Sequence, residues 1–196
     1  MNFTIEKESE LITSEAWRII AETEVMDIWQ GIGAQVNPVG SLAMGLMMGH
    51  RDIDLHIYSD PFLIADSFAA AGRLAENPGI QSLTYINLLA AEDRCLEWHA
   101  DYLGHDGEAW KMDMIHIRKD SPYVGYFEKV AERVKAVLTD ETRSAILKIK
   151  KAIQEEENVL GIRIYRAVVQ GGARDLPGFR RWEREHPMNG IERWMP

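Results

Sequence analysis

Residues 39–58 read VGSLAMGLMMGHRDIDLHIY, and this stretch decides the expected fold. It contains a Gly-Ser pair, Gly40 and Ser41, followed after ten residues by Asp52 and Asp54 among apolar residues. Successive side chains of a β-strand alternate between its two faces, so both carboxylates are expected on one face. Two neighbouring carboxylates repel each other and favour a divalent cation. Because glycine lets the main chain approach phosphate oxygens closely, the stretch indicates chemistry on a nucleoside triphosphate.

The same stretch resembles the signature of the nucleotidyltransferase superfamily of DNA polymerase beta type. The matching residues are 39–41 and, after the gap, 52–55, which supply the Gly-Ser pair and the acid-apolar-acid-apolar run. Ala43 and Gly45 match small residues of the minimal and antibiotic-modifying branches, whereas Arg51 stands where those branches often carry a small residue. The resemblance implies an α/β (α+β) fold, with a mixed-sheet core flanked by helices and an all-helical C-terminal domain.

Hydrophobic periodicity divides the chain into an α/β part, residues 1–120, and a helical part, residues 121–196. The expected elements are helices over 13–31, 41–48, 60–75, 162–169 and 179–185, with further helix from about 122, and strands over 34–39, 51–58, 80–88, 96–103 and 110–117. Thr13 or Ser14 is expected to cap the first helix, and Asp60-Pro61 to open the third. The last two strands are expected to form an antiparallel hairpin.

Two-metal phosphoryl transfer needs ligands on both sides of the phosphate, and the resemblance implies a third carboxylate on a neighbouring strand. Asp113 lies inside an alternating run, where a lone buried carboxylate is costly unless it meets a cation. The alternative is that Asp113 lies on the solvated face of the hairpin, and the resemblance favours the metal ligand. Asp101 and Glu97 are candidates for the general base, with a charged outer strand face as the alternative.

Four positions are candidates for binding the nucleotide. Gly40 and Ser41 are expected to cradle the β and γ phosphates, although alone they would indicate only a strand-to-helix turn. Arg51 either contacts a phosphate or lies solvated on the opposite strand face. Lys148, in the basic run 148–151, either supplies a cation to the phosphates, as the resemblance implies, or belongs to a solvated helix face.

Composition restricts the class of partner. The 196 residues carry a net charge of −9, which argues against broad nucleic-acid binding. The single cysteine, Cys95, excludes an intramolecular disulfide and suits the cytoplasm. The N-terminus lacks the pattern of a signal peptide, and no apolar run is long enough to cross a membrane.

The resemblance implies an enzyme that transfers a nucleoside monophosphate from an NTP, such as ATP, to a hydroxyl and releases pyrophosphate. Asp52, Asp54 and Asp113 would bind two Mg²⁺ ions, with Mn²⁺ as an alternative. Size and acidity favour a small-molecule acceptor of the aminoglycoside or lincosamide kind, and a homodimer is one expected assembly. A second hypothesis is a minimal, antitoxin-like nucleotidyltransferase that acts on or with a partner protein. A third is a nucleotide-binding protein without activity.

Overall fold

The computed structural model describes residues 3–105, 107–154, 159–188 and 192–196. The chain forms two compact units, each built from separate segments. The α/β unit consists of Ser14–Val39 and Arg51–Glu128. The helical unit consists of Met1–Thr13, Gly40–His50 and Lys129–Pro196. The division after residue 120 that the sequence predicts stays a prediction.

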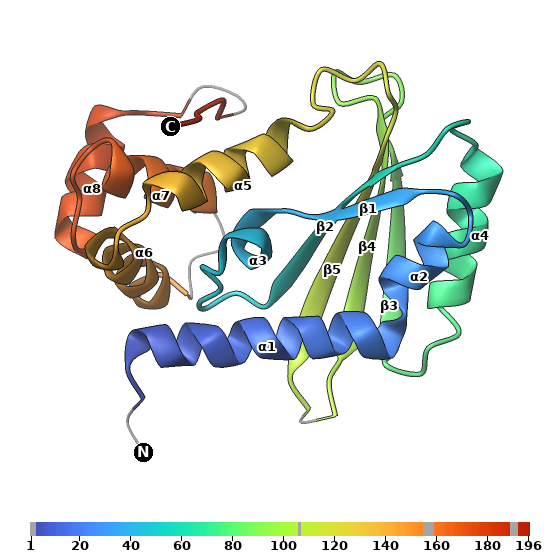
Figure 1. Cartoon of the computed structure of the whole chain (residues 1–196), viewed down its shortest axis with the longest axis horizontal. Helices are drawn as coiled ribbons and strands as arrows, with labels where there is room; N and C mark the ends of the chain where they lie inside the picture. Colours follow the sequence, from blue (N-terminus) through green and yellow to red (C-terminus); the bar gives the residue numbers. More distant parts are fainter. Residues whose placement is uncertain (1–2, 106, 155–158, 189–191) are drawn as a thin grey trace. The chain divides into compact units, whose positions relative to one another are not determined.

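The α/β unit contains a five-stranded mixed sheet in the order β1-β2-β5-β4-β3 (Figure 1). Its strands are β1 (Gln35–Pro38), β2 (Asp52–Tyr58), β3 (Ile80–Asn87), β4 (Cys95–Leu103) and β5 (Ala109–Ile117). The central pair β2 and β5 is parallel, and all other neighbouring pairs are antiparallel. The sheet confirms the five predicted strands and the predicted β4–β5 hairpin.

One face of the sheet is apolar and is covered by helices of the same unit: the second part of α1 (Ile5–Thr23), α2 (Val25–Gln30) and α4 (Ile64–Leu74). The indole of Trp98 on β4 donates to Ser67 Oγ of α4 at 2.9 Å. The ring of Trp29 in α2 contacts His116 of β5, with centroids 5.3 Å apart. The fully buried side chains on this face are those of Ile53, Leu55, Ile57, Leu96, Met112 and Met114. Alternation therefore leaves the neighbouring residues of each strand on the other face.

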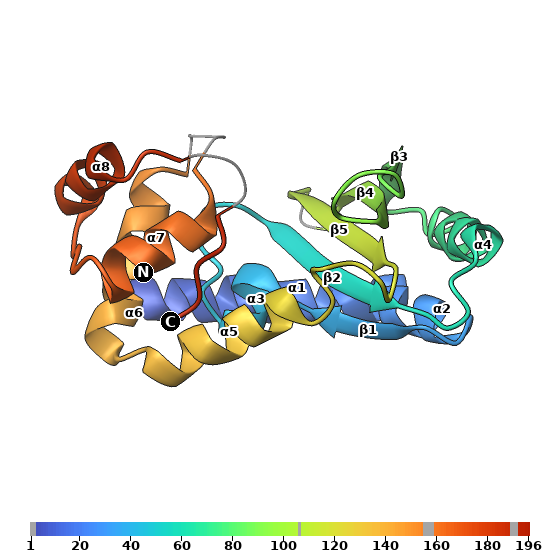
Figure 2. The ribbon, with the colours of Figure 1, turned by 90° about the horizontal axis from the view of Figure 1, so that it is seen from above.

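The helical unit contains α3 (Gly40–Met44), most of α5 (Tyr126–Val137), α6 (Asp140–Ala152), α7 (Gly161–Val169) and α8 (Leu176–Glu185). Thr139 opens α6 with a capping box, and Asp175 opens α8 by accepting from Gly178 N at 2.8 Å. Helix α7 packs against both α6 and α8 (Figure 2). The core of the helical unit contains the buried side chains of Ile146, Leu147, Ile149, Ile164, Val168 and Phe179. No helix in the described ranges is long and apolar enough to cross a membrane.

The first predicted helix is wrong in its bounds. It begins at Ile5 and ends at Thr23, and α2 follows after a break. Thr13 does not cap it, because its hydroxyl donates to Ser9 O at 2.8 Å, one turn back inside the helix. Glu24 causes the break with a φ of 52°, a left-handed conformation that does not continue a right-handed helix.

Two other predicted helices are shorter than expected. Helix α4 begins at Ile64 rather than at Asp60-Pro61. The Asp60 carboxylate accepts from Lys119 Nζ at 2.7 Å, so it is engaged with another segment instead of a helix terminus. Helix α3 ends at Met44, because Gly45 has a φ of 64° and stops the helix before residue 48.

Candidate active site

Three predicted acids lie together on the second, polar face of the sheet. Asp52 and Asp54 alternate with the buried Ile53 on β2 and therefore share this face. In the parallel β2–β5 pair, Asp54 is the direct partner of Asp113. Paired residues of neighbouring strands point to the same side, so Asp113 joins the two acids of β2. The three side chains are half-buried.

His99 of β4 is the direct partner of Asp113 on its other side. Its Nδ1 lies 2.6 Å from Asp113 Oδ1, and its Nε2 lies 3.2 Å from Glu97 Oε2. Partial burial would lower the pKa of His99. The hydrogen bonds and charges of Asp113 and Glu97 outweigh this effect and raise that pKa above its usual value. The sequence prediction included both acids and did not assign His99, although the alternation of 97, 99 and 101 contained the signal.

The two candidate bases lie on either side of His99 along β4. Glu97 is opposite Ile115, and Asp101 is opposite Lys111. Asp101 is exposed and accepts a hydrogen bond from Ser82 Oγ, while Glu97 is half-buried and holds His99. Both residues therefore point to the face that carries the three aspartates.

Arg51 precedes β2 and is engaged within the α/β unit. Its carbonyl accepts from Lys111 N at 3.0 Å, which extends the β2–β5 pairing by one residue. Its guanidinium lies 3.6 Å from Glu108 Oε2 and 5.5 Å from the centre of the Trp110 ring. The role of Arg51 in phosphate binding stays a prediction.

The Gly-Ser pair belongs to the helical unit. Gly40 opens α3 with a φ of 60°, a conformation that favours glycine. The hydroxyl of Ser41 accepts from Lys150 Nζ at 2.7 Å and lies 3.0 Å from the hydroxyl of Tyr165. Lys150 also donates to Leu46 O at 2.8 Å and is only 7% exposed. Ser41, Lys150 and Tyr165 form what we call the hydroxyl–lysine cluster.

Two lysines of α6, Lys148 and Lys150, differ in their exposure to solvent. Lys148, the lysine that the sequence prediction selected, is exposed, whereas Lys150 is buried against Ser41. Helix α7 contributes through Gly161, where an added Cβ would lie 3.0 Å from the Tyr165 hydroxyl. The glycine thus leaves room for Tyr165 beside Ser41. A buried ammonium and two hydroxyls together suit an anionic group such as a phosphate.

The acidic face offers a divalent cation carboxylate donors on two adjacent strands. Three carboxylates on adjacent strands are the oxygen ligands that Mg²⁺ prefers, and Asp54 lies directly opposite Asp113. Within the described residues, however, no group of three or more His, Cys, Asp and Glu side chains is gathered closely enough to hold a metal ion. One oxygen of Asp113 is bonded to His99 instead. The donors thus match Mg²⁺ in chemical type and in strand register, but among the described residues their side chains are not gathered into a set of metal ligands.

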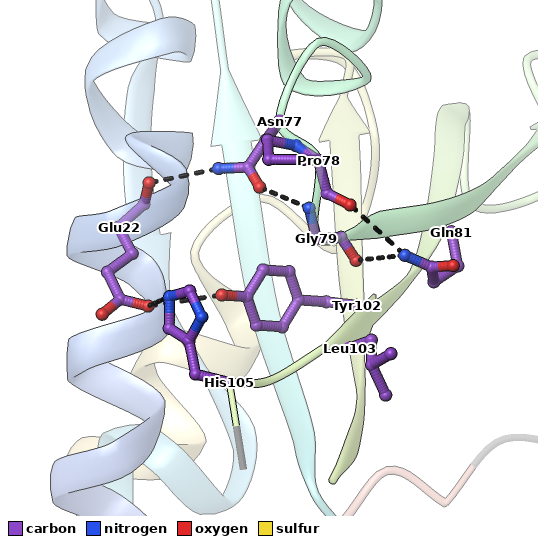
Figure 3. Close-up of a pocket in the computed structure, with 8 residues that line it drawn as sticks. All are labelled: Glu22, Asn77, Pro78, Gly79, Gln81, Tyr102, Leu103 and His105. Carbon is purple, nitrogen blue, oxygen red and sulfur yellow. Dashed lines mark hydrogen bonds and ion pairs between the residues drawn. The ribbon is translucent and has the colours of Figure 1, made fainter. Parts of the chain in front are cut away.

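A separate pocket of about 450 Å³ lies in the α/β unit and contains none of the predicted site residues (Figure 3). It is lined by Glu22, Asn77, Pro78, Gly79, Gln81, Tyr102, Leu103 and His105. Its polar groups bond to one another: Tyr102 OH donates to Glu22 Oε2 at 3.3 Å and Asn77 Nδ2 donates to Glu22 O at 3.2 Å. The pocket is therefore distinct from the acidic face.

The sheet has a parallel β2–β5 pair at its centre and acids on its polar face, and its fold is that of the nucleotidyltransferases. Comparison with solved structures shows this fold. The Cid1 poly(U) polymerase is 13% identical with a TM-score of 0.54, over 84% of this chain and 53% of that one. The poly(A) polymerase complex GLD-2–GLD-3 is 10% identical with a TM-score of 0.55, over 97% and 67%.

The polymerase core of TRAMP, an RNA surveillance complex, is 14% identical with a TM-score of 0.51, over 82% of this chain and 55% of that one. The chain spans about half the length of the Cid1 and TRAMP chains. No family model and no curated protein sequence matches it. The resemblance to the nucleotidyltransferase superfamily is confirmed in the fold, and the antibiotic-modifying branch stays a prediction.

Proposed function

We propose that this protein transfers a nucleoside monophosphate from an NTP to a hydroxyl of a small-molecule acceptor and releases pyrophosphate. The observation that carries the proposal is the pairing of Asp54 with Asp113 on adjacent parallel strands, with Asp52 on the same face. In this reaction the acceptor oxygen forms a bond to the α phosphorus, and the bond from that phosphorus to the pyrophosphate oxygen breaks. The acceptor proton passes to a base.

Each group has a role in this proposal. Asp52, Asp54 and Asp113 would hold Mg²⁺, which supplies positive charge against the phosphates. His99 holds one oxygen of Asp113 in place. Glu97 or Asp101 would accept the proton, and the two carboxylates flank His99 along β4.

Phosphate binding is assigned to the hydroxyl–lysine cluster. Lys150 brings a buried positive charge to Ser41, and an ammonium gives charge-assisted hydrogen bonds to phosphate oxygens. Gly40, with its positive φ, lets the main chain approach the same oxygens. Lys148 is the alternative cation, and the two lysines can be compared directly by mutation.

Charge supports a small cationic acceptor. The α/β unit contains seven of the chain's 22 Lys and Arg residues but 18 of its 31 Asp and Glu residues. Such a unit repels a polyanion and attracts a polycation such as an aminoglycoside. The RNA enzymes Cid1 and TRAMP share the fold, so an RNA acceptor is the competing result of the test.

The test is pyrophosphate release with Mg²⁺, each of the four NTPs, and three sets of acceptors: aminoglycosides, lincosamides and an RNA oligonucleotide. The proposal expects release with a small acceptor and none with RNA. Asp54→Asn and Asp113→Asn should each abolish it, while the exposed Glu76→Gln should not change it. Release that depends on RNA alone would overturn the small-molecule acceptor, and release unchanged in Asp54→Asn would overturn the site.

A further inference from the structure

Strand β3 forms one edge of the sheet. It pairs with β4 on one side, and the described part of the chain places no strand on its other side (Figure 2). Gln81, Ser82, Thr84, Ile86 and Asn87 are exposed. An edge strand presents unpaired N–H and C=O groups, which can pair with a further strand.

The two edge strands of the sheet differ in how well they are protected against pairing with a further strand. The edge strand β1 has only four residues and ends at Pro38, and both features discourage further pairing. Strand β3 has eight residues and contains no proline and no charged residue. Its pairing with β4 is irregular only between Ile80 and Ser82, so Ser82–Asn87 runs as a regular strand. The longer edge is thus the unprotected one.

Apolar surface continues from β3 onto α4. Phe68 is 47% exposed, and its ring centroid lies 4.7 Å from that of Tyr85 on β3. Leu63 and Ile64 at the start of α4 are 46% and 44% exposed. Ile86 is 40% exposed on the other face of β3, because it follows Tyr85 in the strand. An uncharged edge bordered by exposed apolar side chains is typical of a surface that another chain covers.

The direction of the main-chain groups is set by the pairing with β4. Leu88 N donates to Cys95 O at 3.0 Å, so the even-numbered residues of the regular stretch turn their main-chain groups toward β4. Leu83 and Tyr85 therefore turn their N–H and C=O groups outward. These groups are spaced to exchange hydrogen bonds with an antiparallel strand.

We propose that this edge pairs with the same edge of a second copy of the chain, antiparallel and about a two-fold axis at Thr84. The axis places Leu83 of each copy opposite Tyr85 of the other, so their outward groups pair and their apolar side chains share one face. It places Ser82 opposite Ile86 and Thr84 opposite Thr84. Two copies of an acidic chain can meet here because β3 itself is uncharged. The two five-stranded sheets become one.

The first test is the mass of the purified protein by sedimentation equilibrium, with a dimer of the 22.4 kDa chain expected. Thr84→Cys should then form a disulfide-linked dimer under mild oxidation, because residues facing each other across such an axis bring their Cβ atoms close. Ser82→Cys is the matched control on the same strand and face. Its two sulfurs would lie roughly 14 Å apart, from four residues of offset, so no cross-link is expected.

The second test uses charge. Thr84→Lys places two ammonium groups opposite each other and should convert the dimer to monomer, while the exposed position leaves the fold intact by circular dichroism. Gln35→Lys, on the other edge strand, should leave the dimer unchanged. A monomeric wild-type protein, or a dimer that neither cross-links through Thr84→Cys nor dissociates in Thr84→Lys, overturns the proposal. The test does not depend on nucleotidyl transfer.

Discussion

His99 Nδ1 lies 2.6 Å from Asp113 Oδ1, and the two residues are direct partners in the β4–β5 pair. The same imidazole reaches Glu97 with its other nitrogen. A carboxylate held in this way has one oxygen fixed and one oxygen left to turn toward the polar face. His99 is therefore a positioning residue for the acid that the sequence predicts as the third metal ligand.

Replacing His99 with Ala is expected to weaken Mn²⁺ binding by roughly 10- to 100-fold, the usual cost of losing a partner that orients a ligand. The measurement is Mn²⁺ titration followed by electron paramagnetic resonance, with nucleotidyl transfer as a second readout. His105→Ala is the control, because His105 is 81% exposed and lies outside the site. Equal Mn²⁺ affinity in the His99 variant and the wild type would show that Asp113 needs no such support.

Replacing Lys150 with Met is expected to raise the Kd for NTP at least about tenfold, since charge-assisted hydrogen bonds contribute about 1.5–3 kcal/mol. Lys148→Met, in the same helix but exposed, is expected to change the Kd little. Calorimetric titration of both variants with NTP distinguishes the two lysines. A larger loss of NTP affinity in Lys148→Met than in Lys150→Met would favour Lys148 as the cation that binds the phosphates. Circular dichroism checks that both variants fold.

Stability is expected to depend on pH through His116. Burial lowers the pKa of this histidine from 6.5 to about 4, and the side chain is fully buried beside Ser59. The folded state therefore binds fewer protons than the unfolded state between these two values. The contribution is complete above pH 6.5 and is lost as the pH falls toward 4, with an upper limit of about 3 kcal/mol.

The pH dependence is checked by urea unfolding at several pH values for the wild type and His116→Met. The variant should lose less free energy of unfolding over this pH range, because it carries no titrating group at this position. Parallel curves for the two proteins would contradict the assignment to His116.

Gly79→Ala is expected to destabilise the α/β unit by about 1–3 kcal/mol through overpacking. An added Cβ would lie 2.3 Å from the ring of Tyr102, which is only 3% exposed and has little room to move. Gly72→Ala is the matched control inside α4, where an added Cβ meets nothing within 4 Å. That change should stabilise the protein by up to about 1 kcal/mol, because alanine favours a helix. Thermal unfolding measures both.

The strands that carry the acids were predictable because their alternation is a local property. Asp52 and Asp54 share a face whatever β2 pairs with, and the run around Asp113 shows the same period. The partnership of Asp113 with His99 was not predictable in the same way. It depends on the register of the hairpin, and a shift by one residue would place Trp98 or Ala100 there instead.

The burial of Lys150 could have been predicted from the sequence, although the basic run led to the selection of Lys148. Ile146, Lys150 and Ile153 follow the i, i+4, i+7 spacing of one helix stripe, so Lys150 lies on the buried side. A lysine in such a stripe needs a polar partner, and Ser41 lies more than a hundred positions away in the chain. Only the tertiary fold brings the two together, which is why the basic run alone did not distinguish its members.

The segment Gly40–His50 belongs to the helical unit, yet the ribosome makes it long before most of that unit. Leu46, Met47 and Met48 are completely or almost completely buried in the finished protein. Until Lys129 and the helices after it have emerged, the segment lacks most of its unit, including Lys150, whose Nζ donates to Leu46 O at 2.8 Å. The nascent chain therefore exposes an apolar stretch that chaperones can bind, and the helical unit can close around it only after the α/β unit has been synthesised.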